Sequence, residues 1–220
     1  MADFALLRKN MVESQVRTSD VTDRRLLRAM LDVPREIFVP DELKALAYSG
    51  DALPLATGLS ARALPAPMTM AKLIQLAAIE PADKVLEVGC ATGYGTALLA
   101  HLAANVTALD SDPALTAAAK TNVAALGLTN DDIETGPMAA GWPEGAHYDV
   151  IVVSGAIPEV PAAWHDQLRQ GGRLVAVIAD GPVARAMLFE RTNSGWGRRF
   201  GFDTTAPALP GFTRKPAFAL

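Results

Sequence analysis

The sequence predicts an α/β protein with a doubly wound, mostly parallel sheet, an N-terminal helical extension and a C-terminal antiparallel hairpin. From about residue 81 onward, short apolar runs alternate with helical segments. The runs are apolar on both faces, which is typical of parallel strands that are covered on both sides. Near the end of the chain, the turn residues at 193–195 separate two further strand-like runs and indicate a hairpin. We expect residues 1–80 to form a helical segment and a loop packed on the core, and residues 81–220 to form the ligand-binding sheet, together as one compact unit.

The first part of the chain has a mostly helical pattern. Apolar residues recur at helical spacing over 6–16 and 26–31, and Asp20 or Thr22 is able to cap the second of these helices. Prolines on both sides of residues 35–38 limit that segment to a short element.

A loop and a helix lead into the sheet. Residues 52–66 contain Pro54, Gly58 and Pro65 and are expected to form an extended loop, and Pro67 opens the helix that follows. Strands are then expected at 84–88, 105–109, around 133, 148–153, 173–179, 186–191 and 196–202, with helices over 93–104 and 113–126.

The composition limits the class of protein. The chain has 220 residues, 50% of them hydrophobic and 20% charged, and its net charge of −4 gives no electrostatic footprint for nucleic acid. A single cysteine, Cys90, excludes an internal disulfide, and 3 scattered histidines form no metal-ligand spacing. Charged residues near the N-terminus do not fit a signal peptide, and no apolar run reaches roughly 18 residues, the length of a membrane span. We therefore expect a soluble cytoplasmic protein with no metal, no nucleic-acid partner and no membrane contact.

The sharpest local signal follows the first predicted strand, where residues 85–95 read V-L-E-V-G-C-A-T-G-Y-G. A turn of small residues between a buried strand and a helix exposes backbone N–H groups to a ligand. The spacing of Gly89, Gly93 and Gly95 does not match the G-x-G-x-x-G pattern of dinucleotide sites. Glu87, ahead of the first glycine, would repel a phosphate and suits a ligand that carries an ammonium and a sulfonium.

Asp110 ends the second predicted strand, where a carboxylate can accept hydrogen bonds from both hydroxyls of a ribose. Because ligands in such sheets lie beyond the carboxyl ends of the strands, we expect one ligand to touch the loop and Asp110 together. Structural explanations stay open: the glycines can serve the turn alone, and Asp110, followed by Ser111 and Asp112, can cap a helix. An unpaired Glu87 at a buried strand end is costly and harder to explain in that way.

The loop resembles the E-x-G-x-G-x-G segment of class I methyltransferases that use S-adenosylmethionine, with Ala91 in place of the middle glycine. Other segments are similar to protein-L-isoaspartate O-methyltransferases, among them V-P-R-E-I-F-V-P at 33–40 and the runs at 11–17, 156–161 and 167–175. We therefore expect membership of this family, along a similarity that covers most of the chain.

The resemblance implies a function and a set of contacts. Members of the family use S-adenosyl-L-methionine to methylate the free carboxyl of L-isoaspartyl residues in a protein or peptide, which is a repair reaction. The positions that we expect to contact the cofactor are Glu87, Gly89, Cys90, Ala91, Thr92, Gly93, Tyr94, Asp110, Ser111, Met138 and Ser154.

Two departures from the family pattern affect the expected site. The active-site loop of the family reads roughly G-Q-T-I-S-x-P, and alignment on Pro67 places Ala63 and Pro65 where the family has the hydroxyls of threonine and serine. Ser60 and Thr69 are the nearest hydroxyls but do not occupy the matching positions, so the catalytic residues stay unassigned.

The second departure concerns the adenine. The family has G-D-G after the third strand, with an aspartate that meets the adenine amino group, whereas this chain has Gly136-Pro137-Met138. Pro137 has neither an accepting side chain nor a backbone N–H. Met138 and Trp142 are able to pack on the base instead, although core packing explains them equally well.

These losses leave the chemistry itself in place. A carboxylate with an ordinary pKa of about 3.9 is already ionised at neutral pH, so methyl transfer to it needs alignment and no general base. Two alternatives remain open: a methyltransferase with another acceptor, and a cofactor-binding protein without enzymatic activity. We expect a monomer or a weak dimer.

Overall fold

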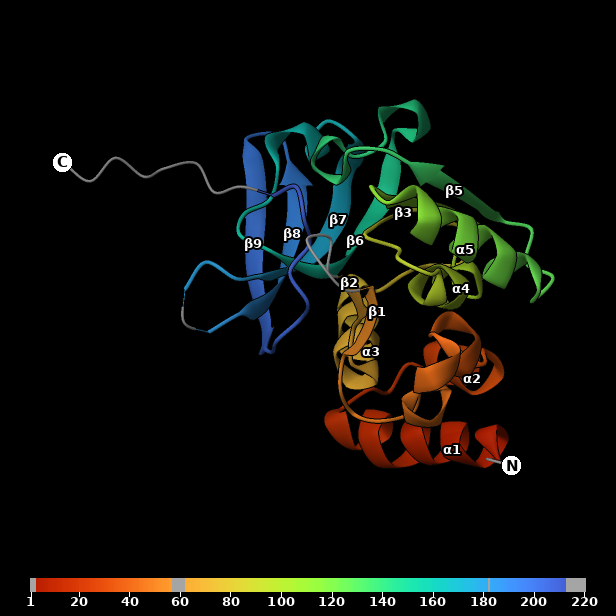
Figure 1. The fold of residues 1–220 in the computed structure, drawn as a ribbon. Coiled ribbons are helices and arrows are strands. Elements are labelled where there is room, and N and C mark those ends of the chain that lie inside the picture. The colour runs from red at the N-terminus through yellow and green to blue at the C-terminus, as the bar shows by residue number, and fades with distance from the viewer. Residues whose placement is uncertain (1–2, 57–61, 182, 213–220) are drawn as a thin grey trace.

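The computed structural model describes residues 3–56, 62–181 and 183–212, and its centre is a seven-stranded sheet (Figure 1). Its strands are β3 (Lys84–Val88), β4 (Asn105–Asp110), β5 (Asp131–Thr135), β6 (Tyr148–Ile157), β7 (Leu168–Ile178), β8 (Arg185–Thr192) and β9 (Gly195–Asp203). The strand order is β5-β4-β3-β6-β7-β8-β9, so the chain starts at the centre, builds outward on one side and then on the other. Strands β3 to β7 are parallel and β8 and β9 are antiparallel. The predicted doubly wound sheet with a C-terminal hairpin is confirmed.

Burial explains why the strand signals differ in strength. The central strands β3 and β6 are apolar on both faces, and Leu86 and Ile151 are fully buried. Strand β5 lies at the edge of the sheet, where Ile133 is buried between exposed or half-buried acidic residues. An edge strand needs only one apolar face, which is why its sequence pattern is weak.

The helices largely follow the predicted order. They are α1 (Phe4–Met11), η1 (Val12–Val16, a π-helical turn), η2 (Arg17–Ser19), α2 (Arg24–Asp32), η3 (Arg35–Phe38), η4 (Asp41–Leu46), α3 (Pro67–Ala77), α4 (Tyr94–Ala100) and α5 (Pro113–Ala124). Pro67 occupies the first turn of α3 as expected. The predicted cap of α2 was wrong, because Asp23 rather than Asp20 or Thr22 accepts from the first N–H groups, with Arg25 N at 2.8 Å.

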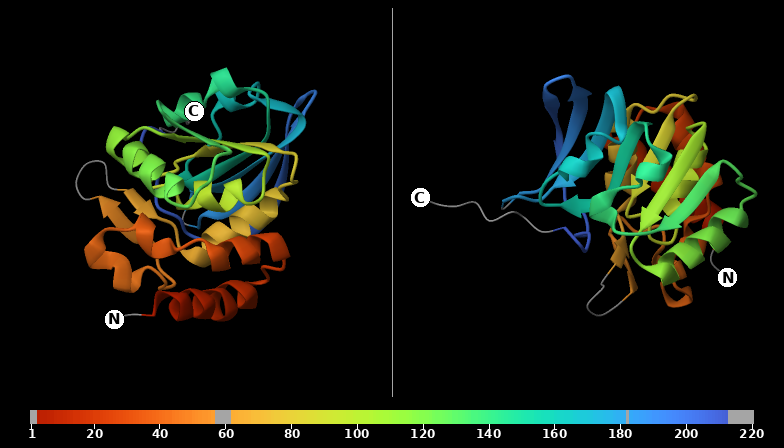
Figure 2. Two further views of the ribbon diagram at one scale, coloured as in Figure 1. Left: turned by 90° about the vertical axis from the view of Figure 1, so that its right-hand side faces the viewer. Right: turned by 90° about the horizontal axis from the view of Figure 1, so that it is seen from above.

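The α-helices pack on one face of the sheet. Residues of α1 to α5 share one buried cluster with Val85, Val106 and Val150. The opposite face carries short 3₁₀ turns, η5 (Met138–Ala140), η6 (Pro143–Gly145) and η7 (Ala162–Trp164), whose Met138 and Trp164 join the second cluster. Figure 2 shows the helices below the sheet and these turns above it in its left view.

Other predicted boundaries need correction. The expected loop at 52–66 contains an antiparallel pair, β1 (Leu53–Ala56) and β2 (Arg62–Leu64), in which the buried Leu53 and Leu64 lie opposite each other. The predicted helix at 93–104 ends at Ala100, because the chain must turn before the N–H of Ala104 bonds to the carbonyl of Asp83. Strand β7 starts earlier than predicted and accommodates its glycine pair through a register shift against β6.

The N-terminal helices share the core of the sheet. Met11, Leu26 and Met30 are fully buried or nearly so, and they belong to the same cluster as the central strands. Within the described residues, no helix is both long and apolar enough to cross a bilayer. The N-terminal region therefore forms a layer under the sheet that reaches the first turn of α4.

Candidate functional site

The turn between β3 and α4 has an unusual backbone. Gly89, Ala91 and Gly93 all have positive φ angles, of 85°, 51° and 95°. A side chain at Gly93 would lie 3.0 to 3.2 Å from Val123 and Ala119 of α5, so the small residue is required by close packing as well. Ala91 holds the left-handed conformation despite its methyl group, which costs roughly 1–2 kcal/mol.

Asp110 lies directly against this turn. It is the last residue of β4 and is fully buried. Its Oδ2 atom accepts a hydrogen bond from the N–H of Ala91 at 2.9 Å, and its Oδ1 atom accepts from the N–H of Asp112 at 3.2 Å. The structure thus brings the loop and the strand-end carboxylate together, as expected for neighbouring parallel strands. The helix cap of α5 is provided by Asp112, so Asp110 is not needed for that purpose.

Arg62 of β2 is the cationic partner of Asp110. Its Nη2 atom lies 2.7 Å from Asp110 Oδ2 and 3.2 Å from the carbonyl oxygen of Gly89, and its Nη1 atom lies 3.7 Å from the sulfur of Met138. Only 3% of Arg62 is exposed. Sequence reasoning missed this contact. The available signal was an arginine at the loop position where the family pattern has glutamine.

Glu87 lies beneath the loop and is fully buried. Its Oε1 atom accepts from Ser154 Oγ at 2.5 Å and its Oε2 atom from Thr96 Oγ1 at 2.6 Å. A methyl group on Gly95 would lie 2.0 Å from Oε1, so the start of α4 covers the carboxylate. Burial, offset in part by the hydroxyl groups of Ser154 and Thr96, raises the pKa of Glu87 to about 7.

Three other predicted contacts face the protein interior. Thr92 Oγ1 donates to the carbonyl of Phe38 at 2.6 Å. Tyr94 is fully buried, in an edge-to-face contact with Phe38 at 5.5 Å and under the guanidinium of Arg35 at 4.6 Å. Cys90 is buried, and burial raises the pKa of its thiol well above the ordinary value. The side chains of Thr92 and Tyr94 connect this region to Phe38 and Arg35 of η3.

The remaining predicted contacts differ in exposure. Met138 is buried in the second cluster, and its carbonyl accepts from Trp164 Nε1 at 3.3 Å. Ser111 is exposed just beyond β4, and Trp142 is partly buried against the same cluster as Met138.

The loop that leads into α3 is held by a buried arginine. Arg35 donates to the carbonyl of Pro65 at 2.7 Å and to that of Ala47 at 2.8 Å. Ala63 is half-buried in β2, opposite Pro54. The two positions that lack the family hydroxyls therefore lie in ordered backbone next to Arg62.

Of the two nearest hydroxyl-bearing residues, Thr69 and Ser60, the structure describes only Thr69. Thr69 is buried in the first turn of α3, and its Oγ1 atom lies 3.0 Å from Thr204 Oγ1. Together with Pro65 and Ser154, Thr69 lines a narrow space that is too small to admit a water molecule. Ser60 lies outside the described residues.

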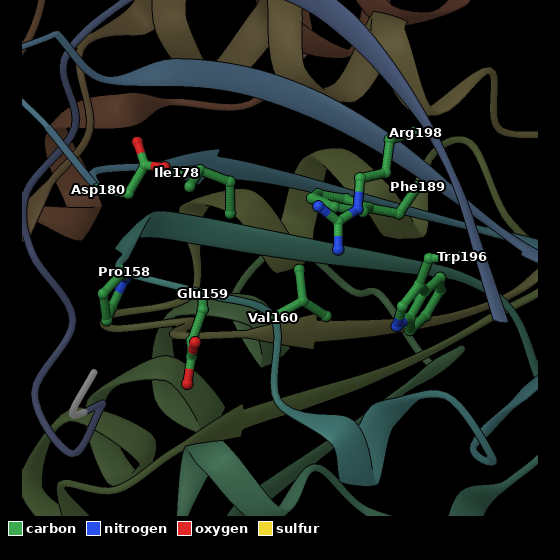
Figure 3. A pocket seen from close by; sticks show the side chains of 8 residues that line it. All are labelled: Pro158, Glu159, Val160, Ile178, Asp180, Phe189, Trp196 and Arg198. Carbon is green, nitrogen blue, oxygen red and sulfur yellow. The ribbon is translucent and has the colours of Figure 1, made fainter. Parts of the chain in front are cut away.

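A separate hollow of about 260 Å³ lies at β7, β8 and β9, on the face of the sheet that carries the second cluster (Figure 3). It is lined by Pro158, Glu159, Val160, Ile178, Asp180, Phe189, Trp196 and Arg198. In Figure 3 the guanidinium of Arg198 lies beside the ring of Phe189, 6.0 Å from its centre. None of the predicted cofactor residues lines this hollow. In the described part of the chain, no group of three or more His, Cys, Asp or Glu side chains is placed to hold a metal ion.

The sequence model of the protein-L-isoaspartate(D-aspartate) O-methyltransferase family matches residues 7–198. The chain belongs to this family. The protein-L-isoaspartate O-methyltransferase of Koribacter versatilis (strain Ellin345) is 37% identical over 92% of this chain and 90% of its own length. That of Methylorubrum extorquens (strain PA1) is 39% identical over 95% of this chain and 91% of its own length.

Solved structures of the family have the same fold. One protein-L-isoaspartate O-methyltransferase superposes with a TM-score of 0.82 and 26% identity, over 93% of this chain and 67% of its own. A family protein from Plasmodium falciparum, solved in complex with S-adenosyl-L-homocysteine, has a TM-score of 0.77 at 19% identity, over 96% of this chain and 100% of its own. The class I methyltransferase fold is therefore confirmed.

The backbone of the loop has the conformation expected for binding an S-adenosyl ligand, but neighbouring side chains occupy the space beside it. The left-handed residues match the glycine positions of the family loop, and Asp110 lies beside them. The cradle at Gly89 is filled, since a methyl group there would lie 2.9 Å from Leu209 Cδ2 and 3.5 Å from Arg62 Nη2. Arg62 and Leu209 thus occupy the space next to Asp110 and Gly89, where the ligand is expected.

Proposed function

We propose that the protein is an S-adenosyl-L-methionine-dependent carboxyl O-methyltransferase that acts on L-isoaspartyl residues in proteins or peptides. The observation that carries this proposal is the family match along residues 7–198. The conformation of the loop supports it, because the turn keeps the left-handed backbone where Ala91 replaces a glycine.

The proposal assigns roles to the residues around the loop. The turn at 89–93 presents backbone N–H groups to the ligand, Asp110 accepts from the ribose hydroxyls, and Met138 and Trp142 pack beside the base. The cofactor supplies a methyl group made electrophilic by its sulfonium. Glu87 needs no ligand to satisfy its oxygens, since Ser154 and Thr96 both donate to it. Its predicted contact with an ammonium stays a prediction.

The acceptor part of the site works by alignment. An isoaspartyl carboxylate is ionised at neutral pH, so the chain has to hold it in line with the methyl group and exclude water. Arg35 fixes the carbonyl of Pro65 and thereby the backbone that leads into α3. Thr69 and Ser154 line the narrow space beside this backbone. This space is closed in the structure, so it is the fixed backbone that supports an acceptor site next to the loop.

A second candidate function is methyl transfer to a different acceptor. It is favoured by Ala63 and Pro65, which stand where the family pattern has hydroxyl groups that contact the substrate. Without these hydrogen bonds, each worth about 0.5–1.5 kcal/mol, the preference for an isoaspartyl residue weakens.

The test is transfer of radiolabelled methyl from S-adenosyl-L-methionine to an isoaspartyl peptide. The matched control is the same peptide with a normal aspartyl residue, and Asp110→Asn controls for the cofactor site. Transfer to the isoaspartyl peptide alone supports the first function. Labelling of proteins in a cell extract but not of the peptide supports the second, and no transfer to either contradicts both.

A further inference from the structure

The guanidinium of Arg62 lies across the predicted nucleoside position. It contacts three residues that we expect to hold the ligand: Asp110 at the ribose, Gly89 in the loop and Met138 at the base. These three contacts lie in different parts of the chain, and the side chain of Arg62 touches all of them. An arginine that served the stability of β2 alone would not need to reach all three.

Most of the acceptor positions of Asp110 are in use while Arg62 is in place, since its carboxylate accepts three hydrogen bonds and has about four such positions. Its Oδ2 atom accepts from Arg62 and from the N–H of Ala91, and its Oδ1 atom accepts from the N–H of Asp112. The carboxylate is 0% exposed. A ribose that donates both of its hydroxyls to Asp110 therefore needs the position that the guanidinium occupies.

Leu209 covers the other side of the same loop. Its Cδ2 atom lies 2.9 Å from the position of a methyl group on Gly89 and 2.6 Å from one on Gly155. The backbone of this segment is held by β6, since the N–H of Leu209 bonds to the carbonyl of Ala156 at 2.9 Å and the N–H of Ala156 to that of Pro207 at 2.8 Å. Gly89 is thus covered from two separate parts of the chain.

We propose that Arg62 is an internal competitor of the S-adenosyl ligand: it pairs with Asp110 in the ligand-free protein and must leave before the ribose binds. This inference rests on the proposed function, because it concerns the same cofactor. A buried carboxylate left without a partner is strongly unfavourable, and Arg62 supplies that partner until the ribose hydroxyls replace it. The protein with an open cleft is then a minor population, and the apparent affinity falls by that fraction.

Isothermal titration with S-adenosyl-L-homocysteine tests this inference without any turnover. The unmodified protein is compared with Arg62→Gln, which removes the charge and leaves Asp110 available. The matched control is Arg28→Gln, which breaks another arginine–carboxylate pair, with Asp32 at 2.8 Å, on the exposed surface of α2. We expect Arg62→Gln to bind at least 10-fold more tightly and Arg28→Gln to bind as the unmodified protein does.

Arg62→Lys is a second variant that tests the same inference if Arg62→Gln fails to fold. An ammonium keeps the charge beside Asp110 but cannot form the same set of contacts to Gly89 and Met138. We expect an affinity between those of the unmodified protein and Arg62→Gln, and a larger rise in melting temperature on ligand addition than the unmodified protein shows.

The outcomes separate the two proposals. Equal or weaker binding by folded Arg62→Gln and Arg62→Lys, with clear binding by the unmodified protein, overturns the role of Arg62 and leaves the cofactor assignment standing. No binding by any of the proteins overturns both.

Discussion

Glu87 is a residue whose pKa is changed by its burial in the fold. Its carboxylate is fully buried under the first turn of α4, with Ser154 and Thr96 as donors. The unfolded chain releases this proton near the ordinary pKa, whereas the folded protein keeps it up to a pKa of about 7. Between these values the folded state binds more protons, so the free energy of unfolding falls as pH rises.

The first prediction concerns this pH dependence. Relative to Glu87→Gln, the unmodified protein should lose about 3 kcal/mol of unfolding free energy as pH rises from about 4.5 to about 7, and nothing more above that. Urea unfolding at a series of pH values measures the difference. Parallel pH profiles of the two proteins would show that Glu87 is not protonated in the folded state.

The second prediction concerns Gly95. Alanine normally stabilises a helix by about 1 kcal/mol relative to glycine. At Gly95 its methyl group would meet Glu87 Oε1 at 2.0 Å, and that carboxylate is held in place on both oxygens. Gly95→Ala should therefore reduce the free energy of unfolding by about 1–3 kcal/mol. Gly181→Ala, which meets nothing within 4 Å, is the matched control. Denaturant unfolding that finds Gly95→Ala as stable as the control contradicts the packing argument.

At the scale of elements, β2 and the residue after it carry most of what distinguishes this chain from its family pattern. Arg62 reaches Asp110 beside the loop, while Ala63 and Pro65 stand where the family pattern has hydroxyl groups. The backbone between them stays fixed, because Arg35 holds the carbonyl of Pro65. Changes of side chain at Ala63 and Pro65 should therefore act on binding and rate with little effect on the fold.

The third prediction follows from that fixed backbone. The double substitution Ala63→Thr with Pro65→Ser should raise methyl transfer to an isoaspartyl peptide roughly 10-fold, since each hydroxyl adds about 0.5–1.5 kcal/mol of hydrogen bonding to the acceptor. Initial rates with radiolabelled cofactor measure it, and Ala52→Thr, at an exposed position before β1, is the control. A rate no higher than that of Ala52→Thr would indicate that this backbone does not face the acceptor.

The sequence predicted best those elements that are defined by their own apolar spacing and flanking residues. The strand at 105–109 and the helix at 113–126 differ from β4 and α5 by only one or two residues at an end, because their apolar spacing and flanking residues define them. The pair β1 and β2 escaped prediction, because Pro54 and the short length conceal strands that exist only through pairing with each other. The position of Asp110 beside the loop followed from the order of parallel strands. Its contact with Arg62 did not, since 48 residues separate them in sequence.

At the scale of the whole molecule, one of the two buried clusters joins the N-terminal helices to the sheet. Met30 and Phe38 share a buried cluster with Val85 and Val150. Tyr94 strengthens this connection, because it lies between Phe38 and Arg35 at the start of α4. The predicted division at residue 80 therefore separates two stretches of sequence that use the same interior.

The fourth prediction is that the protein unfolds in one cooperative transition. Trp142, Trp164 and Trp196 report on the second part of the chain, whereas far-ultraviolet circular dichroism includes the N-terminal helices. Urea transitions followed by tryptophan fluorescence and by circular dichroism should coincide. An earlier loss of circular dichroism would mean that the N-terminal helices unfold independently of the sheet.

Ala91 shows that the backbone conformation of a family motif can persist after one of its glycines has been replaced. The residue keeps a backbone conformation that suits glycine, and the neighbouring strands and helix hold it there at a modest energetic penalty. A search that demanded glycine at this position would discard the chain even though its turn follows the expected path. To recognise divergent relatives, one should ask whether the residues packed around the turn can still hold this backbone conformation. Counting glycines in the motif is a poorer criterion.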